Sequence, residues 1–191
     1  MQADGAQEMS IRPFPGTVGT PNDAKYVITS VEPAALNRIS IGRNIATEPS
    51  RREAARGARD SGEPRMTRRL AGARDMQRRS AHLVYVPLYG KGAPVETEAE
   101  RRAAHVGWVD AQFFTDNFLN GVLGPMGEPM TLYFVEDGGL SRAHLRYASG
   151  ATGGAAAANA AAGAVAAGAL LRFERVTALD MAGQRFQLGW Q

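Results

Sequence analysis

The amino-acid sequence predicts an α+β fold built on antiparallel sheets. Runs of β-branched and aromatic residues dominate the 191-residue chain, and short helix-like segments lie between them. Most of the strand-like runs are close together in sequence, which favours antiparallel pairing over the long crossovers that parallel strands need. We expect two sheets, separated near residues 103–107.

The first elements are expected to be two strands and a helix. Residues 9–16 should form a short edge strand, because prolines interrupt the run, and residues 24–33 should form a second strand. In the helix that follows, Thr47 is the expected N-cap, Pro49 fits the first turn, and Gly62 fits the position just beyond the end.

The only apolar face of this helix consists of Ala54, Ala55 and Ala58. A face so narrow and shallow predicts a helix on the protein surface, with its arginines in water.

Further elements follow along the rest of the chain. A strand should begin at Pro64, and Thr97 should cap a short helix that ends at Arg102. A later amphipathic helix is expected to turn Phe118, Leu119, Val122 and Leu123 inward. Strands are also expected over residues 80–90, 107–113, 130–139, 140–149, 170–179 and 184–191. We expect the Ala/Gly-rich segment 150–169 to be a flexible loop.

Composition excludes several classes of function. The hydrophobic content of 44% is typical of a globular domain with a core. There is no cysteine, so disulfides, thiolate metal sites and cysteine nucleophiles are excluded. No apolar run reaches the roughly 20 residues that cross a bilayer, and the N-terminal residues lack the apolar core of a signal peptide.

Positive charge is concentrated in one segment. Residues 51–79 hold ten arginines against four acidic residues, a local charge of +6 in a chain of net charge +3. Such clusters occur on proteins that bind nucleic acid or anionic surfaces. The aromatic residues, however, lie in strand-like runs rather than among the arginines, where bases would stack on them. We favour a solvated helical face and keep nucleic-acid or anionic-surface binding as the alternative.

The residue patterns of common enzymes are missing from the sequence. His82, His105 and His144 have no partners at metal-ligand spacing. No GxSxG, P-loop or GxGxxG motif opens a helix after a strand. Glu32 has no second carboxylate at a catalytic spacing. We therefore expect no catalytic residue, no metal ion and no cofactor.

Four pieces of sequence occur in the order and spacing of a known sensor family. They are Tyr26 with Val31–Pro33, the segment from Gly42 to Gly62, Pro87–Tyr89, and Arg101–Gly107. With these pieces, the chain resembles the CHASE domain. This domain is the extracytoplasmic sensor of bacterial histidine kinases and cyclic-dinucleotide enzymes, and it is related to the sensor of plant cytokinin receptors.

The resemblance implies a long N-terminal helix followed by two PAS-like α+β subdomains. Residues 1–106 would form the membrane-distal, ligand-binding subdomain, and residues 107–191 the membrane-proximal one. Since the chain begins where the long helix should end, we expect a receptor fragment truncated at that helix.

The resemblance also implies function and partners. The fragment itself would have no catalytic activity. It would lie in the periplasm, bind an unidentified small molecule and form a homodimer. Flanking transmembrane helices and a kinase or cyclase output domain would lie elsewhere in the receptor. Nucleic acid is not an expected partner.

By the same resemblance, four positions would contact the ligand. Asn44 stands where plant cytokinin receptors carry an aspartate that accepts hydrogens from adenine. An amide lacks the carboxylate charge and offers one donor group, so adenine-type cytokinins are disfavoured. Met66 would offer backbone hydrogen bonds on a pocket strand, Gln77 a polar contact, and Tyr85 an apolar wall on the opposing strand.

Overall fold

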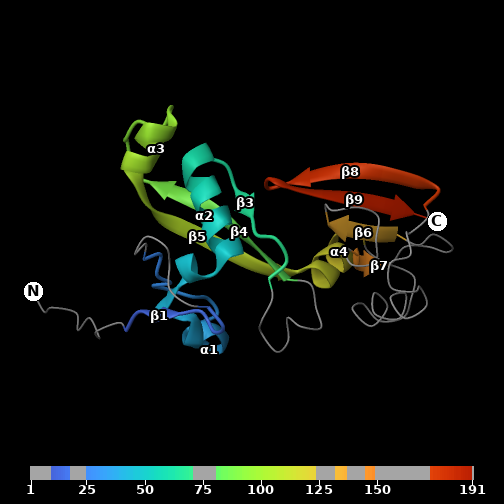
Figure 1. Ribbon diagram of the computed structural model, residues 1–191, viewed down its shortest axis with the longest axis horizontal. Coiled ribbons are helices and arrows are strands. Elements are labelled where there is room, and N and C mark those ends of the chain that lie inside the picture. Colours follow the sequence, from blue (N-terminus) through green and yellow to red (C-terminus); the bar gives the residue numbers. More distant parts are fainter. Residues whose placement is uncertain are drawn as a thin grey trace, which may run out of the picture. The chain divides into compact units, whose positions relative to one another are not determined.

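The computed structural model of the chain describes residues 10–17, 25–70, 81–123, 132–136, 145–148 and 173–190. This described part contains four α-helices and three small sheets with mostly antiparallel pairs, so the predicted α+β class is confirmed, although two sheets were expected (Figure 1). Two compact units are present, Met1–Glu53 and Ala54–Gln191. The PAS-like subdomains and their boundary after residue 106 stay predictions.

The first unit contains a parallel pair of two-residue strands. β1 (Arg12–Pro13) pairs with β2 (Arg43–Asn44), and Val27 forms an isolated bridge to Asn44. The long strand predicted for residues 24–33 is therefore wrong. Its β-branched residues meet a partner strand of only two residues, which cannot support a longer ladder. A short helix, α1 (Ala34–Asn37), and a 3-10 turn follow.

Helix α2 (Pro49–Ser61) has the start and end that the sequence predicts (Figure 1). Proline occupies its first position, where no backbone N–H is needed. Gly62 follows its last residue with a φ of 80°, and the Gly62 N–H donates to the Ala58 carbonyl at 2.9 Å. A glycine is required there because the left-handed conformation disfavours side chains.

The predicted N-cap of α2 is wrong by one residue. The carboxylate of Glu48 accepts the N–H groups of Ser50 and Arg51 at 3.2 and 2.7 Å. The Thr47 hydroxyl has other partners: it accepts the N–H of Phe14 at 3.0 Å and donates to the Asn44 carbonyl at 2.8 Å, across the 3-10 turn that precedes α2. Glutamate was overlooked because the shorter side chains of Ser, Thr, Asp and Asn are the preferred caps.

The second unit contains a three-stranded antiparallel sheet of order β3-β4-β5. Its strands are β3 (Arg65–Met66), β4 (Ala81–Tyr89) and β5 (His105–Phe114), and α3 (Glu98–Ala104) leads into β5. The predicted Thr97 cap of α3 is confirmed. The Thr97 hydroxyl accepts the N–H of Glu100, and the Glu100 carboxylate accepts the N–H of Thr97.

Helix α4 (Thr115–Leu123) follows β5 and buries only part of the face that was predicted to point inward. Leu119 is 5% exposed, whereas Phe118 and Val122 are 39% and 65% exposed. The inward orientation is therefore wrong for Phe118 and Val122, because only the Leu119 side of the helix meets the core. The side chain of Leu123 lies outside the described residues.

A four-stranded sheet completes the second unit, in the order β7-β6-β9-β8. Its strands are β6 (Leu132–Glu136), β7 (Leu145–Ala148), β8 (Arg175–Met181) and β9 (Gln184–Trp190). The predicted turn between the last two strands is confirmed: Ala182 and Gly183 have φ values of 47° and 75°, as the two central residues of a type I′ hairpin turn require. The predicted loop at residues 150–169 lies outside the described residues.

The core of the second unit lies between the two sheets. Met66 from β3, Leu119 from α4, Phe134 from β6 and Phe186 from β9 are buried together. The rings of Phe134 and Phe186 stack with centroids 4.5 Å apart. Partly buried residues of β4, β5 and β8 pack against this cluster. Strand β3 therefore belongs to one sheet and contributes to the core that both sheets share.

Candidate functional site

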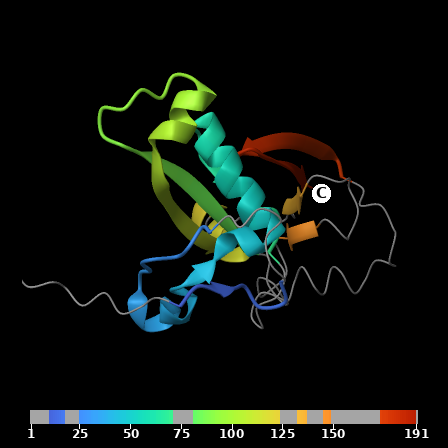
Figure 2. The same ribbon diagram turned by 60° about the vertical axis from the view of Figure 1, so that its left-hand side comes forward.

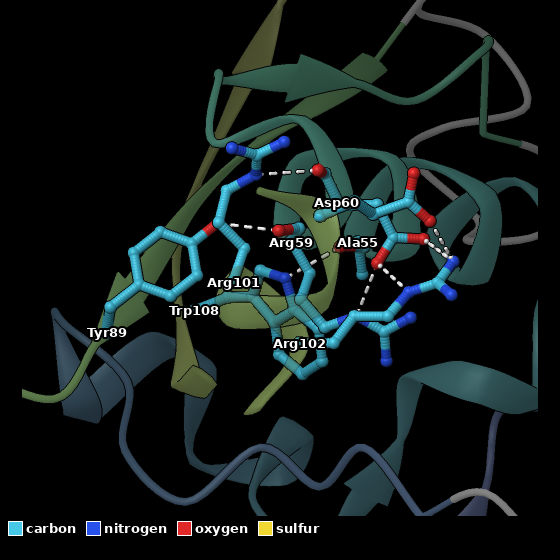
Figure 3. A network of polar contacts seen from close by, with 8 residues as sticks. Ala55, Arg59, Asp60, Tyr89, Arg101, Arg102 and Trp108 are labelled. Atoms are coloured by element: carbon cyan, nitrogen blue, oxygen red, sulfur yellow. Dashed lines mark hydrogen bonds and ion pairs between the residues drawn. The ribbon is translucent and has the colours of Figure 1, made fainter. Parts of the chain in front are cut away.

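One face of the three-stranded sheet is covered by helix α2 (Figure 2). Trp108 on β5 donates its indole N–H to the carbonyl of Ala55 at 2.7 Å, and Tyr89 on β4 donates its hydroxyl to the carbonyl of Arg59 at 2.6 Å. Figure 3 shows both aromatic side chains reaching the helix backbone. The sheet thus holds α2 by hydrogen bonds to its carbonyls as well as by packing.

The alanine face of α2 makes this close approach possible. Ala54, Ala55 and Ala58, the apolar face identified in the sequence, are 6%, 0% and 0% exposed. Small side chains bring the helix backbone within hydrogen-bonding distance of the indole of Trp108. A larger residue in the centre of this face would push the helix away from the sheet.

The arginines of α2 are mostly not solvated, which corrects the sequence-based prediction. Of the four arginines in this helix, only Arg56 is exposed. The guanidinium of Arg51 lies over the Phe14 ring, 4.3 Å from its centroid. Arg52 donates to the carbonyl of Ala46 at 2.6 Å. Arg51, Arg52 and Arg59 are partly buried, and each has a partner in the protein.

A cluster of charged residues fixes the C-terminal end of α2 to α3 (Figure 3). Asp60 accepts two hydrogen bonds from Arg102, at 3.0 and 2.8 Å, and one from Arg59 at 2.7 Å. Arg101 donates to the Asp60 carbonyl at 2.8 Å, which satisfies a group that the helix leaves open. Glu98 completes this Asp60 cluster through an ion pair with Arg102.

The Asp60 cluster keeps its charges over a wide pH range. Hydrogen bonds from Arg102 and then Arg59 hold the pKa of Asp60 well below its usual 3.8, although partial burial opposes them. In turn, the hydrogen bond to Asp60 raises the pKa of Arg102 above its usual value. The stability that this aspartate contributes is present above pH 3.8 and is lost as the pH falls further. The cluster therefore has a structural role, in which Asp60 and Glu98 offset the charges of Arg59 and Arg102.

A histidine lies beside the two aromatic residues that hold α2. The ring centroid of His105 is 4.1 Å from that of Trp108 and 6.2 Å from that of Tyr89. Burial and then the charge of Arg59 lower the pKa of His105, while the Gly107 backbone and Asp60 oppose this change. Protonation would place a second positive charge next to Arg59.

The lowered pKa of His105 predicts that acid reduces the stability of the fold. Because the unfolded chain binds the His105 proton more readily, the free energy of unfolding should fall as the pH drops below about 6.5. Urea denaturation at a series of pH values measures the effect. In His105→Gln, which does not titrate, the decline between pH 7 and 5 should be shallower than in the wild type. Equal slopes would contradict the assignment to this histidine.

Tyr85, one of the predicted ligand contacts, lies under α2. It is 1% exposed and points to the same face of β4 as Pro87, whose cross-strand partner is Trp108. Its neighbours in register are Arg65 on β3 and Asp110 on β5. The structure thus places Tyr85 between the sheet and the alanine face of the helix.

Met66 lies on the neighbouring strand with its side chain on the opposite face. That side chain is 2% exposed and belongs to the core between the sheets. The backbone groups, which were predicted to bond a ligand, both have partners: the Met66 N–H donates to the Ala182 carbonyl at 2.7 Å, and the Met66 carbonyl accepts from Nε2 of Gln184 at 3.1 Å. Both partners come from the β8–β9 hairpin.

Asn44 belongs to the first unit, whereas Met66 and Tyr85 belong to the second. It is 7% exposed, and its Oδ1 accepts the N–H groups of Tyr26 and Ala46 at 2.9 and 3.1 Å. The side chain thereby caps the 3-10 turn that precedes α2. Gln77 lies outside the described residues. A ligand contact at any of these four positions stays a prediction.

Sequence reasoning overlooked the residues that position α2, chiefly Trp108, Asp60 and Arg101. The indole N–H of Trp108 in a half-buried strand was a usable signal, because such a donor needs a partner. The bond between Asp60 and Arg102 joins residues 42 positions apart, and a local sequence pattern does not predict such a contact.

The hydrogen bond from Trp108 to Ala55 can be tested alone. Trp108→Phe keeps an aromatic ring in place and removes the donor, so we expect the free energy of unfolding to fall by about 1–2 kcal/mol through the lost bond and the buried carbonyl left without it. Urea denaturation measures this change. Trp190→Phe, in the other sheet, serves as a control for the loss of one indole. An unchanged stability in Trp108→Phe would show that the bond contributes nothing.

Comparison with known proteins gives one family. The CHASE domain model matches residues 1–147 of the chain. No curated protein matches it. In the described part of the chain, no helix is both long and apolar enough to cross a membrane.

Proposed function

Because the chain belongs to the CHASE domain family, whose members are extracytoplasmic sensor modules of signalling receptors, we propose that it senses a small molecule for a transmembrane histidine kinase or cyclic-dinucleotide enzyme. CHASE domains bind small molecules and are not catalytic. In this proposal the chain lies in the periplasm, between transmembrane helices and before an output domain.

The observation that carries the proposal is the family match over residues 1–147. It includes α2 and the whole sheet that α2 covers. Within the proposal, Tyr85 is the apolar wall beneath this helix, and Met66 offers its peptide groups at the edge of β3. Asn44 and Gln77 contribute polar contacts. Since Oδ1 of Asn44 already accepts two backbone N–H groups, we expect a ligand other than an adenine-type cytokinin.

The proposed receptor is a homodimer. The face of the β3-β4-β5 sheet opposite α2 carries exposed apolar side chains: Val86, Leu88 and Val109 are 41%, 42% and 57% exposed. Apolar surface of this kind is often covered in an assembly, which supports a dimer.

Nucleic-acid or anionic-surface binding through residues 51–79 is the alternative. It requires arginines that are available to phosphate groups. In the part of this segment that the structure describes, Arg56, Arg68 and Arg69 are exposed. Arg51, Arg52 and Arg59, however, have partners within the protein. These contacts favour the sensor proposal.

A thermal-shift screen tests the two proposals against each other. The panel contains adenine derivatives, amino acids, organic acids and oligonucleotides, each at two salt concentrations. A sensor saturated at a hundred times Kd gains about 2.7 kcal/mol, which corresponds to a rise in Tm of about 5–10 °C for a chain of this size. The rise should be insensitive to salt and confined to one chemical class.

Two variants show whether a stabilising compound binds under α2. Tyr85→Leu changes the predicted wall and should reduce the ligand-induced rise in Tm. Val109→Thr, on the exposed opposite face, should leave it unchanged. Stabilisation by oligonucleotides alone, weakening steeply with salt, would contradict the sensor proposal and support the alternative.

A further inference from the structure

Strand β3 has one edge on β4 and a second edge that faces away from it. On the β4 side, the Thr67 N–H donates to the Leu83 carbonyl at 2.8 Å, and the Leu83 N–H donates to the Thr67 hydroxyl at 3.0 Å. The N–H and the carbonyl of Met66 point to the outer edge. An outer edge of this kind offers a donor and an acceptor to a ligand or to another segment of chain.

The turn of the β8–β9 hairpin occupies this outer edge. Its Ala182 carbonyl and its Gln184 side chain bond the two peptide groups of Met66, at 2.7 and 3.1 Å. In Figure 1 the turn reaches from the other sheet to β3. The hairpin thus uses the same two groups that a ligand at Met66 would need.

Packing around the turn is close. A Cβ atom added to Gly183 would lie 2.8 Å from Cδ of Arg65 and nearer still to one guanidinium nitrogen. The φ of 75° favours glycine at this position, and an added Cβ would also force the Arg65 side chain to shift. Most side chains of β8, which leads into the turn, are exposed. To open the edge of β3, the turn has to leave Met66, and its residues Met181 and Ala182 have to give up part of their packing against the core.

We propose that the turn Met181–Gln184 is an internal competitor for the edge of β3. It occupies the Met66 peptide groups in the ligand-free protein, and a ligand that bonds these groups displaces it. Ligand binding at the β3-β4-β5 sheet then moves the β8–β9 hairpin of the other sheet. This inference rests on the proposed function, because it takes Met66 to be a ligand contact.

Amide hydrogen exchange measured by NMR tests the contact without a ligand. In the wild type, the Met66 amide should exchange faster than the Leu83 amide, because the turn opens without global unfolding. Gln184→Ala removes one of the two bonds, and we expect about fivefold faster exchange at Met66. Arg185→Ala, which removes an exposed ion pair with Asp180, is the matched control and should leave the rate unchanged.

Two outcomes of the exchange experiment would overturn the proposal. One is equal exchange at Met66 and Leu83 in the wild type, which would mean that the turn opens only when the whole unit unfolds. The other is an unchanged Met66 rate in Gln184→Ala.

A steric variant provides an independent test of the same contact. Gly183→Ala should push the turn off β3 and accelerate exchange at Met66. This effect has two causes, strain in the turn and the clash with the Arg65 side chain. Arg65→Ala removes the clash but not the strain. We therefore expect a smaller effect of Gly183→Ala in the Arg65→Ala background. The same effect in both backgrounds would contradict the close contact.

Binding measurements test the competition itself. Any panel compound that stabilises the wild type should bind Gln184→Ala about fivefold more tightly, because the turn occupies the outer edge of β3 in a smaller fraction of the molecules. Equal affinity for the wild type, Gln184→Ala and Arg185→Ala would overturn the competition and leave the sensor proposal intact. Binding to none of the three proteins would count against both.

Discussion

Phe186→Ala is expected to lower the free energy of unfolding by about 3–5 kcal/mol, the usual range for removing a buried aromatic side chain. Phe186 is 0% exposed, stacks on Phe134 with centroids 4.5 Å apart, and meets the edge of the His82 ring at 5.9 Å. It stands in the core that both sheets of the second unit share. Urea denaturation followed by circular dichroism measures the loss.

A surface residue of the same hairpin provides the control. Val176 on β8 is 41% exposed, so Val176→Ala should change stability by no more than about 0.5 kcal/mol. A loss below about 1 kcal/mol in Phe186→Ala would contradict a core shared by the two sheets. Such a result would also count against the packing that holds the hairpin next to β3.

Ala55→Leu is expected to destabilise the protein by about 1–3 kcal/mol through overpacking. Ala55 is 0% exposed, and its carbonyl accepts the hydrogen bond from Trp108. A leucine here moves the helix away from the sheet, so the fluorescence of Trp108 should change together with stability. If the ligand binds under α2 as proposed, the ligand-induced rise in Tm should also become smaller.

Arg56→Leu introduces the same side chain one residue further along α2. Arg56 is the exposed arginine of this helix, so the control should stay within about 0.5 kcal/mol of the wild type. If Ala55→Leu were as stable as this control, α2 would not pack on the sheet through its alanine face.

Local chemistry made several elements predictable. Pro49 and Gly62 mark the two ends of α2 because each has a backbone property that suits that position. The capping box of α3 and the turn at Gly183 follow equally local rules. The apolar face of α2 was identified from the sequence, since amphipathic periodicity depends on neighbours in one helix.

Features that depend on distant parts of the chain were missed. The arginines of α2 were expected in water, yet Arg59 and Arg102 meet at Asp60 only after α3 folds against the helix. Phe118 was placed inward because periodicity shows which residues share a helix face, but not how much of that face a neighbour covers. Likewise, the family resemblance implied that Met66 would offer its peptide groups to a ligand, and only the fold shows the hairpin bonded to them.

The most direct test of the sensor proposal is a map of amide chemical shifts during titration with the compound that stabilises the chain best. The proposal predicts saturable changes concentrated on β3 and β4 around Met66 and Tyr85, with further changes at the turn Ala182–Gly183 as the hairpin is displaced. Changes confined to the arginines of α2, produced by oligonucleotides and lost at high salt, would contradict it.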